Sequence, residues 1–205
     1  APSRGRQQAS AASPDGAFEA RYRDGNLYLK PTTGDEKAIT TDGDGKLKYG
    51  SASWVYGEEL DQTTAMCWSP DSKKLAFYKF DDRNVKDFVL LKGWTKLHNV
   101  VMTEAYPKPG QPNPIAGLMV LDVASGALTT VDVGSDTNQY IYEVEWTPDS
   151  SGLLYRRTNR HQDTLDVVVA DPKSGATRIV LTEKQDTWQE NSPDFEFLKD
   201  GKRFL

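Results

Sequence analysis

The stretch Trp68-Ser69-Pro70-Asp71-Ser72 decides the fold class, because its pattern recurs along the chain. Proline sets φ for a turn, aspartate hydrogen-bonds its own backbone, and serine or glycine closes the turn. A short apolar run follows each copy, so each copy is expected to join the two strands of a hairpin. The other copies are Ser13-Pro14-Asp15-Gly16, Thr147-Pro148-Asp149-Ser150 and the degenerate Lys199-Asp200-Gly201-Lys202.

A second hairpin is expected after each of the first three copies. Two apolar runs flank a glycine turn there, at Gly34, Gly126 and Gly175. Two hairpins per repeat give four antiparallel strands, which is the content of one propeller blade. No stretch shows the apolar period of a long helix. The sequence therefore predicts an all-β fold, a partial β-propeller of four-stranded antiparallel blades with about three blades and incomplete ends.

A ring of about three blades leaves unpaired strand edges at both of its ends. A propeller closes its ring to remove exposed blade edges, and about three blades cannot do so. Residues 1–205 are therefore expected to be a fragment of a longer protein's propeller. The open edges predict self-association, and a homodimer is the expected assembly.

Composition and charge narrow the classes of function. The 205 residues are 37% hydrophobic and carry a net charge of -5, with acids and bases interleaved, so nucleic acid is not expected as a partner. The longest apolar runs, such as residues 165–170, are too short to cross a bilayer. Residues 1–13 contain no apolar run, so no signal peptide is expected there.

The regular spacing breaks in the second repeat, and function is expected near the break. Between Phe80 and Gly117 the repeat gains about thirty residues relative to its neighbours. Residues 106–114 contain four prolines and a glycine, which favours an extended, turn-rich loop. A second irregular segment, residues 50–60, precedes the strand that contains Trp68.

That second segment contains the candidate binding residues, Glu58 and Glu59, in Trp54-Val55-Tyr56-Gly57-Glu58-Glu59-Leu60. Adjacent glutamates are most often a solvated surface pair, but two aromatic residues and a valine precede these. On one turn of helix the two side chains diverge by about 100°, so both carboxylates could converge on one cation. A primary ammonium, with its three donors, suits such a pair.

Signatures of catalysis are missing from the chain. It contains no G-x-S-x-G nucleophile elbow and no phosphate-binding loop. His98 and His161 lack metal-ligand spacing, and Cys67 is expected to be a small buried residue. No catalytic residue, metal or cofactor is therefore predicted, and the chain alone is expected to be a binding surface.

Two segments resemble the dipeptidyl peptidase IV family of serine peptidases. The run from Trp54 to Glu59 resembles the family's W-V-Y-E-E-E, and Tyr106-Pro107-Lys108-Pro109-Gly110 with Asn113-Pro114 resembles its Y-P-K-A-G-x-x-N-P. Trp68-Ser69-Pro70 lies between them, as W-S-P does in the family, and Thr187-Trp188 is similar to a later stretch. The departures are Gly57 for the first glutamate and a proline for the alanine.

The resemblance implies an eight-bladed propeller that caps an α/β-hydrolase domain, which lies outside this chain together with the serine, histidine and aspartate of catalysis. It implies removal of Xaa-Pro or Xaa-Ala dipeptides from peptides with a free N-terminus, in a periplasmic or secreted protein. The propeller would gate substrate access. Glu58 and Glu59 match the two glutamates that hold the substrate's α-ammonium in the family.

Two alternatives remain open at the level of sequence. One is a non-catalytic propeller that binds peptides or proteins. The other is a prolyl endopeptidase or acylaminoacyl peptidase, whose propeller gates access without a pair of glutamates, and Glu58 with Glu59 weighs against it.

Overall fold

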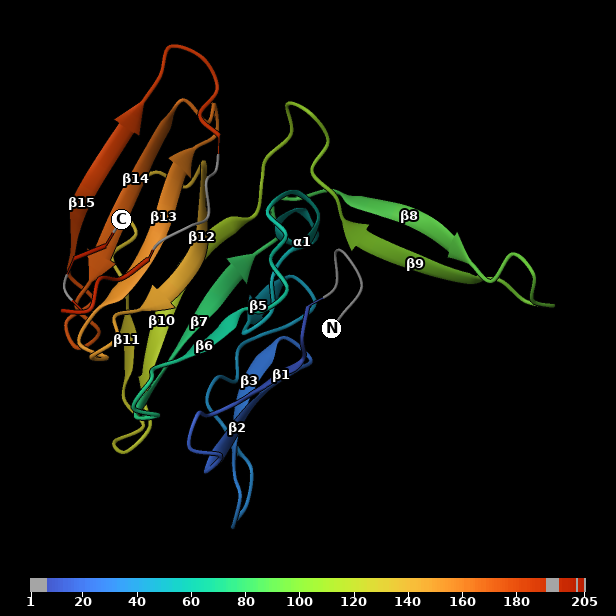
Figure 1. Cartoon of the computed structure of the whole chain (residues 1–205). Coiled ribbons are helices and arrows are strands. Elements are labelled where there is room, and N and C mark those ends of the chain that lie inside the picture. Colours follow the sequence, from blue (N-terminus) through green and yellow to red (C-terminus); the bar gives the residue numbers. More distant parts are fainter. Residues whose placement is uncertain (1–6, 191–195, 202, 205) are drawn as a thin grey trace.

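The structure, a computed structural model, describes residues 7–190, 196–201 and 203–204. Three antiparallel sheets of four or five strands lie in chain order, and the first strands of neighbouring sheets contact one another (Figure 1). This arrangement confirms the prediction of an all-β partial propeller. The first sheet comprises β1 (Ser10–Ala12), β2 (Phe18–Arg23), β3 (Asn26–Pro31) and β4 (Lys37–Ala38), and the third comprises β12 (Gln139–Trp146), β13 (Leu153–Asn159), β14 (Thr164–Ala170) and β15 (Thr177–Lys184).

The second sheet begins with a strand that is split in two. Both β5 and β6 pair with β7, so together they take the place of one first strand. Tyr78 marks the split, because its carbonyl accepts from Gly50 N at 2.9 Å and its N–H donates to Ala65 O at 3.0 Å. The chain between these bonds forms the helix α1 (Trp54–Glu59). The strands are β5 (Leu47–Tyr49), β6 (Met66–Trp68), β7 (Lys74–Asp81), β10 (Ile115–Asp122) and β11 (Leu128–Thr130).

A two-stranded arm extends away from the sheets between β7 and β10 (Figure 1). It consists of β8 (Asp87–Lys92) and β9 (Val100–Ala105), which pair in antiparallel register. Residues 106–114, here called the proline loop, follow the arm and contain no strand, as predicted. The arm itself was not predicted. Its apolar side chains are exposed, as Val89 (60%) and Val101 (62%) show. Its strands therefore lack the alternation of apolar and polar residues by which a half-buried strand is recognised in a sequence.

The tryptophan before the turn motif fastens each blade to the previous one. Trp68 Nε1 donates to Ala11 O at 2.9 Å, and Trp146 Nε1 donates to Cys67 O at 2.9 Å. Both bonds join the first strand of a blade, or its end, to the first strand of its predecessor. The motif therefore specifies contact between blades as well as a turn within each.

The fourth residue of the motif makes a second contact of the same kind. Ser72 Oγ accepts from Asp15 N at 3.1 Å, and Ser150 Oγ accepts from Asp71 N at 3.1 Å. Both serines have positive φ, 59° and 60°, like Gly16 at 70° in the first copy. Serine at this position accepts a strained backbone and gains a hydrogen bond to the neighbouring blade.

The fourth copy of the motif follows the third sheet. Gly201 has a φ of 64° and its N–H donates to Leu198 O at 2.8 Å, as Gly16 N–H does to Ser13 O, so this turn runs from Leu198 to Gly201, one residue earlier than the sequence pattern indicated. Phe197 forms an antiparallel bridge with Phe204. Lys202 and Leu205, which belong to this copy and to the run after it, lie outside the described residues.

The turn aspartates give the fold a predicted dependence on pH. Hydrogen bonds from the hydroxyls of Thr147 and Ser151 hold the pKa of Asp149 at about 2, below its ordinary value of 3.8. A carboxyl whose pKa is lower in the folded state contributes stability above its unfolded pKa and loses it as the pH falls. We expect Asp149→Asn to lower the urea midpoint at about pH 5 and to have little effect at about pH 2. A difference that stays constant with pH, or the same result with the exposed control Asp186→Asn, would contradict this expectation.

Candidate functional site

The helix α1 is too short to be stable on its own, because isolated helices of its length do not form in water. Ser53 at its N-cap makes no side-chain capping bond. Tertiary contacts hold it instead: Tyr56 is 1% exposed, and its ring meets the edge of Phe80 at a centroid distance of 4.6 Å. The Tyr56 hydroxyl also accepts from Ile141 N at 3.1 Å, which ties the helix to the third sheet. The core therefore fixes one face of α1.

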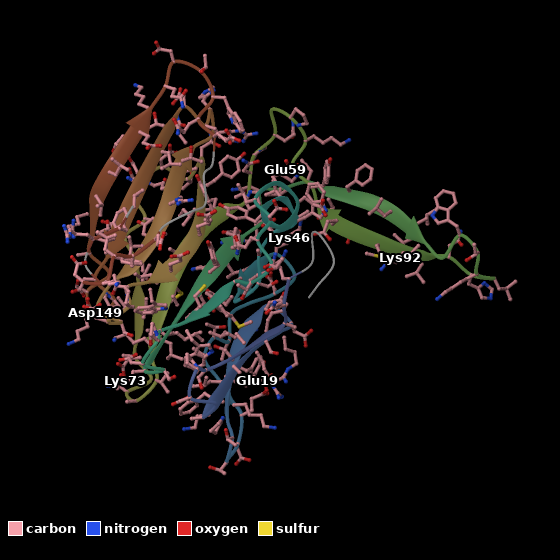
Figure 2. The ribbon with its side chains drawn as sticks, viewed as in Figure 1. Glu19, Lys46, Glu59, Lys73, Lys92 and Asp149 are labelled. Atoms are coloured by element: carbon pink, nitrogen blue, oxygen red, sulfur yellow. The ribbon has the colours of Figure 1, made fainter. Side chains whose placement is uncertain are left out.

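Both candidate glutamates lie at the C-terminal end of α1, on one helical turn. Glu59 is exposed at the end of the helix (Figure 2). It also lines a pocket of about 670 Å³. Glu58 is half-buried and is not among the described residues that line this pocket. The structure thus brings the two glutamates together on one helical turn but presents only Glu59 to the pocket.

The pocket, here called the α1 pocket, lies between three parts of the fold. Trp54 and Glu59 come from α1, while the proline loop, beginning at Tyr106, supplies a second wall. Tyr140 on β12 and Arg160 in the turn between β13 and β14 complete it from the third sheet. Its walls therefore combine aromatic and charged side chains, which can supply contact area and orient a bound ligand.

Acidic groups outnumber basic groups around the α1 pocket. Four carboxylates line it, and two cations, Lys108 and Arg160, do so as well. One carboxylate, Glu143, forms an ion pair with the buried Arg156 and sits at a β-bulge with a φ of 49°. An excess of negative charge in a cleft attracts cationic ligands. The four carboxylates belong to Glu59, Asp61, Glu143 and Glu190.

The proline loop is fixed to the third sheet at its C-terminal end. Asn113 Nδ2 donates to Tyr140 OH at 2.7 Å, and Arg160 donates to Gln111 O at 2.7 Å. Arg160 also donates to Asn138 Oδ1 at 3.3 Å. These bonds make the loop a defined wall of the pocket.

Several pocket residues were not found by sequence reasoning. Tyr140, Arg160 and Gln162 are distant in sequence from α1, and only the packing of the third sheet brings them to it. Trp188 was noted for its resemblance to the family but not for its position, which is fixed by a bond from its Nε1 to Gln162 Oε1 at 3.0 Å. The polar run from Asn159 to Asp163 between two apolar strands was the available signal.

Other candidate chemistry finds no support among the described residues. Burial raises the pKa of the Cys67 thiol to about 12, so this sulfur is a poor nucleophile. No group of three or more His, Cys, Asp or Glu side chains in the described part of the chain is placed to hold a metal ion. Within that part, no helix has the length and apolar character to cross a membrane.

Comparison with known proteins gives consistent matches along the chain. Residues 1–205 match the family described as "Dipeptidyl peptidase IV (DPP IV) N-terminal region". A probable dipeptidyl-aminopeptidase B of Pyrenophora teres f. teres is 33% identical over 87% of this chain, and one of Ajellomyces dermatitidis is 34% identical over 87%. The chain spans only 22% and 21% of these two relatives. The crystal structure of dipeptidyl peptidase 4 from Porphyromonas gingivalis superposes with a TM-score of 0.80 at 30% identity, over 87% of this chain and 26% of that one.

Proposed function

The chain belongs to the dipeptidyl peptidase IV family, within its N-terminal region, and from that premise we propose that it anchors the N-terminus of a peptide substrate for a serine exopeptidase and gates access to it. The observation that carries the proposal is the position of Glu59, which lies at the end of a fixed helix and lines a pocket with acidic and aromatic walls. Glu58 and Glu59 would bind the substrate's α-ammonium. Charge-assisted hydrogen bonds of this kind contribute about 1.5–3 kcal/mol each.

The proposal assigns catalysis to a part of the protein outside residues 1–205. We place there an α/β-hydrolase domain with a serine activated by histidine and oriented by aspartate. Anchoring the ammonium at a fixed distance from that serine would let only the second peptide bond reach it. The product would then be a dipeptide, with proline or alanine as its second residue.

A reporter peptide tests this function. We expect the full-length protein that contains this chain to cleave an Ala-Pro reporter amide with a free N-terminus at least about tenfold faster than its N-acetylated form, because acetylation removes the charge that the carboxylates bind. Equal cleavage of both forms would leave a hydrolase without an ammonium anchor. Absence of cleavage of either form would favour a non-catalytic binding module.

A homodimer is a second part of the proposal. The arm exposes apolar side chains along both strands, among them Leu91 (49%) and Val100 (60%), and such surfaces often mark protein interfaces. We expect light scattering to give a dimer mass for the full-length protein and a lower mass for the Leu91→Glu, Val100→Glu variant. A monomer at high concentration for the unmodified protein would contradict the assembly.

A further inference from the structure

The side of α1 that faces the proline loop depends on one aromatic contact. Trp54, the first residue of the helix, is half-buried and lines the α1 pocket. Its ring lies 4.4 Å from that of Tyr106, centroid to centroid, at an interplanar angle of 46°. Tyr56 fixes the opposite side of the helix in the core. The orientation of α1 about its own axis is therefore set by two aromatic anchors, one internal and one at the surface.

Tyr106 is itself held from behind by the arm. Its N–H donates to Lys86 O at 3.0 Å, which extends the pairing of β8 and β9 by one bond. Its ring lies 5.7 Å from Phe88 on β8, and Lys108 Nζ lies 5.4 Å from the centroid of the same Phe88 ring. Tyr106 thus links the base of the arm to the helix that bears the glutamates.

From this arrangement we infer that Tyr106 is a positioning residue for the ammonium anchor. The inference rests on the proposed function. Tyr106 packs against Trp54 at the N-terminal end of α1, Tyr56 fixes the opposite side of the helix, and a six-residue helix held on two sides presents Glu59 to the pocket in one orientation. The contacts that carry this role are between rings, so the phenyl group is sufficient and the hydroxyl is not needed.

Kinetics of the full-length protein on the free Ala-Pro reporter test the inference. Tyr106→Ala is expected to raise KM by about two- to twelvefold, the range that loss of one aromatic pair corresponds to, while kcat changes less. Tyr106→Phe is expected to restore the original KM. Phe88→Ala, which removes support behind Tyr106 without altering a described pocket residue, is expected to raise KM in the same direction by a smaller factor. Tyr28→Ala on β3, in the first sheet, is the matched control and should leave KM unchanged.

Three results would overturn the inference. The first is an unchanged KM in Tyr106→Ala. The second is a raised KM in Tyr106→Ala with no change in Phe88→Ala, which would mean that Tyr106 contacts the substrate directly. The third is an equal rise of KM in Tyr28→Ala. If Tyr106→Ala does not fold, Tyr106→Leu keeps the apolar bulk and is expected to show the KM rise. The variant Glu58→Gln, Glu59→Gln separates the two levels of the proposal. If it leaves KM unchanged, the ammonium anchor is wrong, whereas if it raises KM and Tyr106→Ala does not, only the role of Tyr106 is wrong.

Discussion

Replacing Glu58 and Glu59 together by glutamine should reduce kcat/KM of the full-length protein for the free Ala-Pro reporter by about 10²–10⁴-fold. Two charge-assisted hydrogen bonds at about 1.5–3 kcal/mol each account for this range. Glutamine keeps the length and helix propensity of the side chains, so α1 should persist. Steady-state kinetics on the free and acetylated reporters measure the loss. Cleavage of the acetylated reporter should change little, because it has no ammonium to lose.

The single variants Glu58→Gln and Glu59→Gln should differ in how much kcat/KM they lose. Glu59 is exposed to the α1 pocket and Glu58 is half-buried, so Glu59→Gln should cause the larger loss. Asp61→Asn removes a carboxylate from the same pocket without touching the pair and serves as the control. If all three single variants lose activity equally, the general negative charge of the pocket would explain the result and the specific anchor would not.

Replacing Tyr56 by alanine should lower the free energy of unfolding by about 3–5 kcal/mol, as truncation of a buried aromatic side chain does. Tyr56 is 1% exposed, meets the edge of Phe80 at 4.6 Å and accepts a bond from Ile141 N, so the variant loses packing and leaves a buried N–H without its partner. Equilibrium unfolding in urea, followed by tryptophan fluorescence, measures the change.

The conservative variant separates the two contributions of Tyr56. Tyr56→Phe keeps the ring against Phe80 and loses only the acceptor, so it should cost about 1–3 kcal/mol. A loss below about 1 kcal/mol in Tyr56→Ala would show that α1 is held in place by other contacts.

The sequence predicted the features of this fold that depend on local chemistry. The turn copies at Ser13, Ser69 and Thr147 carry their own side-chain hydrogen bonds to the following aspartate, so the hairpins they join could be recognised directly. The sequence left open whether Glu58 and Glu59 lie on a strand or on one turn of helix, and α1 places them on a helical turn. Their role in binding stays a prediction.

The features that escaped prediction depend on contacts between distant residues or on apolar strands that face solvent. The split of one strand into β5 and β6 is visible only through Tyr78, which bonds to both sides of the break. The arm was missed because its apolar residues face solvent, whereas strand prediction from sequence assumes that apolar residues are buried. Tyr140 and Arg160 reach the α1 pocket only because the third sheet packs beside the second.

The bonds between blades bear on how this protein folds during its synthesis. In each contact between blades the donor tryptophan belongs to the later blade. It lies 57 residues after its acceptor between the first and second blades, and 79 residues after it between the second and third. The serine bonds span the same two separations. The chain leaves the ribosome from its N-terminus, so the edge of each blade lacks these hydrogen bonds until the first hairpin of the next blade has been synthesised. We therefore expect the contacts between blades to form in sequence order, each one once the first hairpin of the later blade has been synthesised.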